Sequence, residues 1–238
     1  MNAFLFGVAL QWKIDLRNRG ILLTYYLVPL VFFAFMSGIF SSINPAAKET
    51  LIQSMTIFGV TMGAILGASA PLVDLYGSEI KKAYKMGGIP LWVATVNNLI
   101  SAFIHLYIMS LIIFFLAPIF FDARLPVELG VYFISLALFI LASLGVGTVL
   151  GLLVKSTSRL TLVAQFVFLP SIMLGGIMFP SDLLPKAFTA ASLVFPATWG
   201  FKLMTSRVLD FQFILPLLVI LVVSGLVIGI RLKRIGLD

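Results

Sequence analysis

The sequence predicts an all-α membrane protein with six transmembrane helices. Six long stretches contain no charged residue, namely 20–47, 50–73, 86–121, 129–154, 160–181 and 211–230. Each is long enough to cross the hydrocarbon core as a helix, which takes about 20 residues. Lipid permits only helices and closed barrels, and no stretch alternates as barrel strands do. With 61% hydrophobic and 11% charged residues, we expect one transmembrane domain over residues 1–238 and no separate soluble domain.

The charged residues between these stretches predict the orientation in the membrane. When alternate gaps are assigned to opposite sides, one side receives eleven of the 16 basic residues and the other side receives five. The eleven are Lys13, Arg17, Arg19, Lys81, Lys82, Lys85, Lys155, Arg159, Arg231, Lys233 and Arg234. An excess of Lys and Arg marks the cytoplasmic side, so both termini are expected there. The net charge of +7 then reflects topology and anionic lipid headgroups, and no nucleic-acid partner is expected.

Residues 2–19 precede the first span and predict an amphipathic helix lying in the membrane interface. Leu5, Val8, Trp12 and Leu16 fall on one helical face, and polar residues cover much of the rest. Trp12 is expected at headgroup level. Two roles remain open for this helix, a topology anchor or a lever that connects a partner to the first span.

The six spans are placed by their apolar runs and by the residues that end them. They are expected at about 21–40, 52–72, 93–116, 129–153, 160–178 and 213–230. Pro90 and Pro118 bound the third span, because proline interrupts a helix. Pro170 and the pair Gly175-Gly176 weaken the outer half of the fifth.

The region 179–201, between the fifth and sixth spans, is too broken to cross the bilayer alone. Its characteristic residues are Pro180, Pro185, Pro196 and Trp199. We expect short re-entrant helices that dip into the outer leaflet and return, with their irregular backbone buried by protein.

The sequence offers little for catalysis or metal binding, and no residue is assigned to either. Cysteine is absent, and the single histidine, His105, lies deep in the third span. A hydrogen bond from its neutral ring to a neighbouring helix is the ordinary explanation for such a residue. Asp74 is the one carboxylate expected close to a span, which argues against an ion-driven transporter. Lys155-Ser156 fails as a nucleotide-binding loop because Val154 stands where that motif needs glycine.

Glycines at helical spacing predict close helix packing. Gly59, Gly63 and Gly67 form a bare stripe on the second span, and the pairs Gly147/Gly151 and Gly225/Gly229 do the same on the fourth and sixth. Packing within one bundle is favoured over a dedicated dimer seam.

The segment 77–90 is the longest loop expected in the cytoplasm, and it is not built like a simple turn. Ile80 and Tyr84 share a helical face, and Gly87-Gly88 followed by Pro90 ends the helix. A loop that only enforces topology needs no more than Lys or Arg, so an apolar-aromatic side favours docking of a partner. The candidate docking residues are Glu79, Ile80, Lys81, Lys82, Tyr84, Lys85 and Met86.

Taken together, these features resemble the type-2 ABC exporter permeases over nearly the full length. The resemblance rests on the interfacial helix, the six spans, both termini inside, and the helix between the second and third spans. The sequences LGGIMFP (174–180), LP (184–185) and FPATW (195–199) look like the family's outer re-entrant helices.

The resemblance implies that residues 77–90 form a coupling helix that inserts into a separate ATP-binding subunit. Two permease chains, identical or different, would work with two such subunits in the plasma (inner) membrane of a bacterium or archaeon. ATP and Mg would bind to the partner subunit, and this chain would bind no cofactor. Because the loops are short and lack a sugar-binding track, a hydrophobic or amphipathic substrate such as a drug, peptide antibiotic or lipid-like molecule is expected.

A candidate substrate path between protomers is formed by aromatic and methionine side chains of the first and fifth spans. These are Phe32, Phe33, Phe35, Met36, Phe166, Phe168 and Met173. Such side chains more often face lipid or the core. Two other classes stay open, an ATP-independent channel or ion-coupled carrier, and a membrane enzyme acting on lipids. The inner loops contain no cluster of Asp, Glu or His, which argues against the membrane enzyme.

Overall fold

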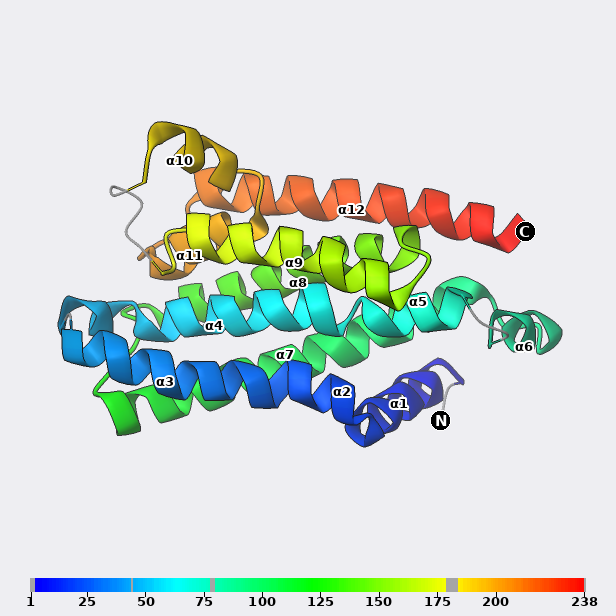
Figure 1. Ribbon diagram of the computed structural model, residues 1–238, viewed down its shortest axis with the longest axis horizontal. Helices are drawn as coiled ribbons and strands as arrows, with labels where there is room; N and C mark the ends of the chain where they lie inside the picture. The colour runs from blue at the N-terminus through cyan, green and yellow to red at the C-terminus, as the bar shows by residue number, and fades with distance from the viewer. Residues whose placement is uncertain (1–2, 44, 78–79, 179–183, 238) are drawn as a thin grey trace.

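The computed structural model describes residues 3–43, 45–77, 80–178 and 184–237 (Figure 1). Over these residues the regular structure is entirely helical, with no strand. Six segments are long and apolar enough to cross a membrane. The predicted fold class, an all-α protein with six membrane-spanning helices, is therefore confirmed.

The first half of the chain contains two spans that are each interrupted by a π-helical segment. Its elements are α1 (Ala3–Arg17), α2 (Arg19–Leu22), the π-helix η1 (Leu23–Leu27), α3 (Val28–Ile43), the 3-10 helix η2 (Pro45–Glu49), α4 (Leu51–Met62), the π-helix η3 (Gly63–Gly67), α5 (Ala70–Gly77) and α6 (Ile80–Met86). Asn18 separates α1 from α2, because its side chain accepts the backbone N–H groups of Gly20 and Ile21.

The second half contains longer, more regular helices. They are α7 (Leu91–Phe121), α8 (Leu129–Leu153), α9 (Thr157–Leu174), α10 (Lys186–Ser192), α11 (Pro196–Thr205) and α12 (Phe211–Leu237). Pro196 occupies the first turn of α11, where its missing N–H costs nothing.

The spans form an elongated bundle whose two ends differ. Both termini and α6 lie at one end, which we name the α6 end, whereas α10 and α11 lie toward the other (Figure 1). At that other end two exposed ion pairs join the loops that follow α3 and α7. Arg124 lies 2.9 Å from Glu49, and Lys48 lies 3.5 Å from Asp122.

The second span is the centre of the bundle. Every residue of α4 from Leu51 to Thr61 is buried, whereas only 11% of the apolar window of the last span is covered. The ring of Phe58 on α4 stacks on Phe32 of α3 at 3.6 Å and meets Phe168 of α9 edge-on at 5.5 Å. The second span therefore joins the first and fifth through a continuous aromatic contact.

The glycine stripes do not all serve the same purpose. The ring of Tyr25 from η1 lies over Gly63 and Gly67 of η3, and α8 brings Gly147 against the backbone of Ala64. Close packing within one bundle is confirmed for the stripes on the second and fourth spans. The same prediction is wrong for the pair on α12, Gly225 and Gly229, because a Cβ at either position would meet open space.

Several predicted boundaries differ from those in the structure. The helix α7 runs through Pro118 to Phe121, since a proline this close to the end removes a single hydrogen bond, and it stops at Asp122 in the left-handed conformation (φ 52°). The helix α9 ends at Leu174, four residues early, where Gly175 follows and Gly176 takes a φ of +77°. The helix α12 continues past the predicted end at residue 230 to Leu237.

Candidate functional site

The helix α6 projects from the bundle between the second and third spans (Figure 1). It ends as the sequence predicts, because Gly88 adopts a φ of +65° and the N–H of Ile89 bonds the carbonyl of Tyr84 at 3.0 Å. Pro90 then begins α7. The side chain of Met86 is 84% exposed, so a large apolar group faces outward at the tip of the molecule.

The candidate docking residues of α6 differ in exposure. Lys82 is exposed, whereas Lys81 and Tyr84 are half-buried. Glu79 and the side chains of Ile80 and Lys85 lie outside the described residues. The observation that most favours a docking surface is therefore the exposed Met86 rather than the predicted Ile80/Tyr84 face.

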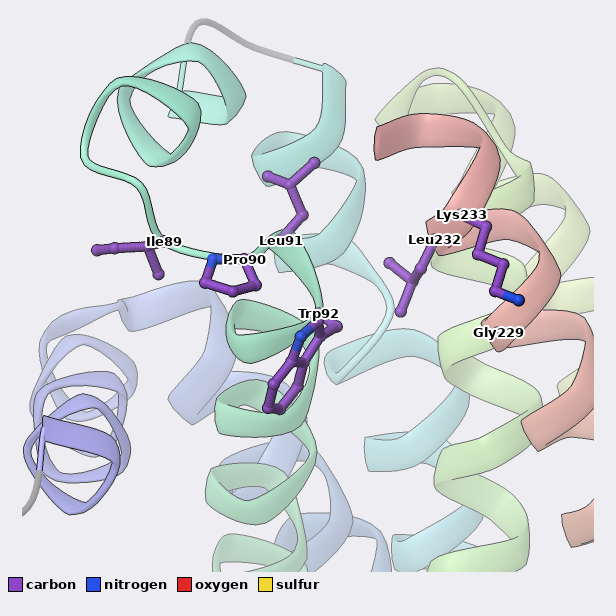
Figure 2. Close-up of a pocket in the computed structure, with 7 residues that line it drawn as sticks. All are labelled: Ile89, Pro90, Leu91, Trp92, Gly229, Leu232 and Lys233. Atoms are coloured by element: carbon purple, nitrogen blue, oxygen red, sulfur yellow. The ribbon is translucent and has the colours of Figure 1, made fainter. Parts of the chain in front are cut away.

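A crevice beside α6 extends the apolar surface (Figure 2). One wall is formed by Ile89 and Pro90 and by the first two residues of α7, and the other is the end of α12 with Gly229, Leu232 and Lys233. Trp92 is 51% exposed and Ile89 47% exposed. This end of the molecule thus presents apolar side chains next to a cation.

A second, larger cleft of about 610 Å³ opens between α1, the first two spans and α7. Its walls include both π-helical segments, through Thr24 of η1 and Leu66 and Gly67 of η3. π-Helical turns inside α-helices are frequently found at functional sites. The polar lining residues are Gln11, Asp15, Asn18, Thr24, Asp74, Tyr84 and Asn98.

Asp15 is the most unusual residue of this cleft, because its carboxylate is only 1% exposed. It accepts hydrogen bonds from Gln11 Nε2 at 2.8 Å and from Ser101 Oγ at 2.5 Å. Among the described residues no cation forms an ion pair with it. Burial raises the pKa of Asp15, although the two hydrogen bonds act in the opposite direction.

The position of Asp15 corrects one expectation. Asp74 is not the only carboxylate near a span, because Asp15 reaches Ser101 inside α7. Leu5 and Leu16 are exposed, as apolar residues of an interfacial helix that face lipid would be, whereas the burial of Asp15 against α7 was not predicted. The sequence did contain a signal, because Val8, Gln11, Trp12 and Asp15 share a helical face, but a carboxylate on a helix is normally read as solvated.

His105 forms a compact aromatic cluster that joins three elements. Trp12 of α1 stacks on its ring at a centroid distance of 3.9 Å and an interplanar angle of 9°. Tyr26 of η1 bonds His105 Nδ1 at 2.7 Å, which is the expected bond to a neighbouring helix. Trp12 is thus packed against α7, and its location at headgroup level remains a prediction.

Replacing Trp12 by alanine should loosen α1 from the bundle. The stacking contact with His105 is lost, which for a half-buried tryptophan should cost about 2 kcal/mol. Hydrogen exchange over residues 3–17 in nanodiscs should accelerate, while exchange in α4 stays unchanged. Leu16→Ala, at an exposed position of the same helix, is the matched control, and equal acceleration by both would contradict this docking.

The candidate path residues do not share one environment. Phe33 is 4% exposed and packs edge-on against Phe121, so it lies inside the bundle. Phe32 and Phe168 belong to the aromatic contact around Phe58, and Met36 is half-buried. Phe35, Phe166 and Met173 are exposed by 70%, 79% and 52%.

Two short helices occupy the region between the fifth and sixth spans. Pro185 precedes α10, and Pro196 begins α11. Two side chains of α11 bond the end of α10, with Thr198 Oγ1 donating to Ser192 at 2.7 Å and Trp199 Nε1 donating to Leu193 at 2.8 Å. Pro180 lies outside the described residues, and insertion into the outer leaflet remains a prediction.

Comparison with known proteins agrees with the architecture. No curated protein sequence matches the chain significantly. The family described as ABC-2 type transporter matches residues 3–209, which contain every helix except α12. The chain therefore belongs to the ABC-2 type transporter family and is a transmembrane permease.

Proposed function

We propose that this chain is the permease subunit of an ATP-driven exporter that moves a hydrophobic or amphipathic substrate out of the cytoplasm. The observation that carries the proposal is α6, a short helix between two spans that presents the 84% exposed Met86 at the end where both termini lie. A separate ATP-binding subunit docks there. Family membership implies such a subunit and a paired arrangement of permeases in general.

The basic residues support a cytoplasmic location of the α6 end in a plasma membrane. The expected inner side holds eleven of the 16 basic residues, an asymmetry that normally marks the cytoplasm. Closure of the ATP-binding subunits pushes α6, and the first two spans bend at their π-helical segments. ATP must favour one arrangement by a few kcal/mol for such a switch to operate.

The surface of α3 and α9 supports the choice of substrate class. Phe35, Phe166 and Met173 are exposed on these two helices, which flank α4 on either side of the Phe58 ring. Two protomers that face each other with these helices enclose an apolar path for a hydrophobic substrate.

Reconstitution of the tagged chain with and without its ATP-binding subunit tests the proposal. We expect the two to co-purify, the permease to stimulate ATP hydrolysis, and native mass spectrometry to show two copies of each. Mass spectrometry of the retained small molecule identifies the substrate. Movement of that molecule by the permease alone would contradict the proposal.

The alternative, an ion-coupled carrier, gains one observation from the structure, the buried carboxylate of Asp15. Such a carrier would work without ATP and would depend on an ion gradient. Imposing and then collapsing a proton or sodium gradient across the same liposomes separates the two mechanisms.

A further inference from the structure

Among the described residues, no cation pairs with the buried carboxylate of Asp15. Buried carboxylates are usually paired with a cation or hold a metal, because the loss of water is expensive. The hydrogen bonds from Gln11 and Ser101 offset that loss only in part, as the raised pKa of Asp15 indicates. Asp15 also lies in the wall of the cleft of about 610 Å³, and because it is only 1% exposed the wall must open slightly for a ligand to reach the carboxylate.

Asn98 provides a second, independent observation in the same cleft. It is 3% exposed, and its Nδ2 donates to the carbonyl of Ala68 at 3.0 Å, which fixes the amide orientation. Within the described part of the chain its Oδ1 accepts no hydrogen bond. A buried acceptor without a donor is costly. Asn98 Oδ1 lacks a hydrogen-bond donor and Asp15 lacks a cation among the described residues, so a cation that donates hydrogen bonds would satisfy both.

The rest of the cleft indicates what kind of cation would fit. Ile14, Leu66 and Leu75 line it with apolar surface, and its volume lies within the range of roughly 300–1,000 Å³ found for small-molecule sites. The described residues contain no group of three or more His, Cys, Asp or Glu side chains that could hold a metal ion. The lining therefore favours a cation with an apolar body over a bare metal ion.

We propose that this cleft binds an organic ammonium cation. The ammonium group lies between Asp15 and Asn98 Oδ1, and the apolar part of the ligand packs on Ile14, Leu66 and Leu75. Because Tyr84 of α6 also lines the cleft, a bound cation contacts the helix at which the ATP-binding subunit docks. The inference concerns binding by this chain and holds independently of transport.

Isothermal titration of the full chain in zwitterionic nanodiscs with n-hexylammonium tests the inference. We expect saturable binding, and at least tenfold weaker binding of n-hexanol, which has the same apolar part without the charge. Separate titrations with Mg²⁺ and Na⁺ distinguish a metal site. Binding of either ion in place of n-hexylammonium, or no saturable binding of n-hexylammonium, would overturn the proposal.

Two variants locate the site. Asp15→Asn preserves the size of the side chain and should weaken n-hexylammonium binding at least tenfold. Asp122→Asn, the same change at the exposed opposite end, should leave it unchanged. Leu75→Trp, which fills the cleft without altering Asp15, should also abolish binding and serves if Asp15→Asn does not fold. Unchanged affinity in either folded cleft variant would overturn the assignment.

Discussion

Replacing Gly147 by alanine should prevent the permease from folding stably. The new Cβ would overlap the carbonyl oxygen of Ala64, and a backbone atom cannot rotate out of the way. The helix α8 would have to move away from η3 along the most buried span, at a cost of about 3 kcal/mol or more. The melting temperature in detergent and the monodisperse fraction in gel filtration should both fall sharply.

The matched controls for this change are alanines in the glycine pair of α12. No atom lies within 4 Å of a Cβ at Gly225 or at Gly229, so the larger side chain meets no obstacle within the protomer. Alanine also favours the helix by up to about 1 kcal/mol relative to glycine. Equal destabilisation at Gly147 and Gly225 would show that these glycines do not differ as the structure indicates.

The two glycine pairs also show what the sequence can and cannot predict. Both have the same four-residue spacing in strongly apolar helices, so the sequence predicts close packing for both. Which helix face meets a neighbour depends on how the bundle assembles, and only the structure shows that α8 is central and α12 peripheral.

The number and order of the spans were predictable because membrane helices follow a strong physical rule. Long charge-free runs must become helices in lipid, and Gly87-Gly88 correctly predicted the end of α6. The π-helical segments η1 and η3 were missed, since no residue type demands them and they arise where Tyr25 packs over Gly63 and Gly67.

The cleft was missed for a different reason. Asp15 and Asn98 lie 83 positions apart in the sequence, on two helices whose contact is not encoded by local spacing. A carboxylate among Lys13 and Arg17 predicts a solvated helix face, and the structure shows instead that α1 turns this residue into the bundle. Docking of α6 on a partner likewise remains a prediction, because the partner's surface decides it.

Replacing Met86 by aspartate should abolish stimulation of the ATP-binding subunit by the permease. Among the described side chains of α6, that of Met86 is the most exposed large apolar group, and docking would bury it. A carboxylate in an apolar docking cleft must give up its water, and loss of a central anchor typically costs 2 kcal/mol or more, about 30-fold in affinity. ATP hydrolysis and co-purification, measured in the reconstituted complex, should both fall to the level of the separate subunits.

The control for Met86→Asp is Val127→Asp, because Val127 is also an exposed apolar residue, at 72%, in a loop of the opposite end. Both variants add one negative charge to the surface, so any effect of net charge or expression is shared. Only Met86→Asp places that charge at the helix that we propose contacts the ATP-binding subunit. If ATP hydrolysis remains fully stimulated in Met86→Asp, or falls equally in Val127→Asp, then the exposed end of α6 is not the surface on which the ATP-binding subunit docks.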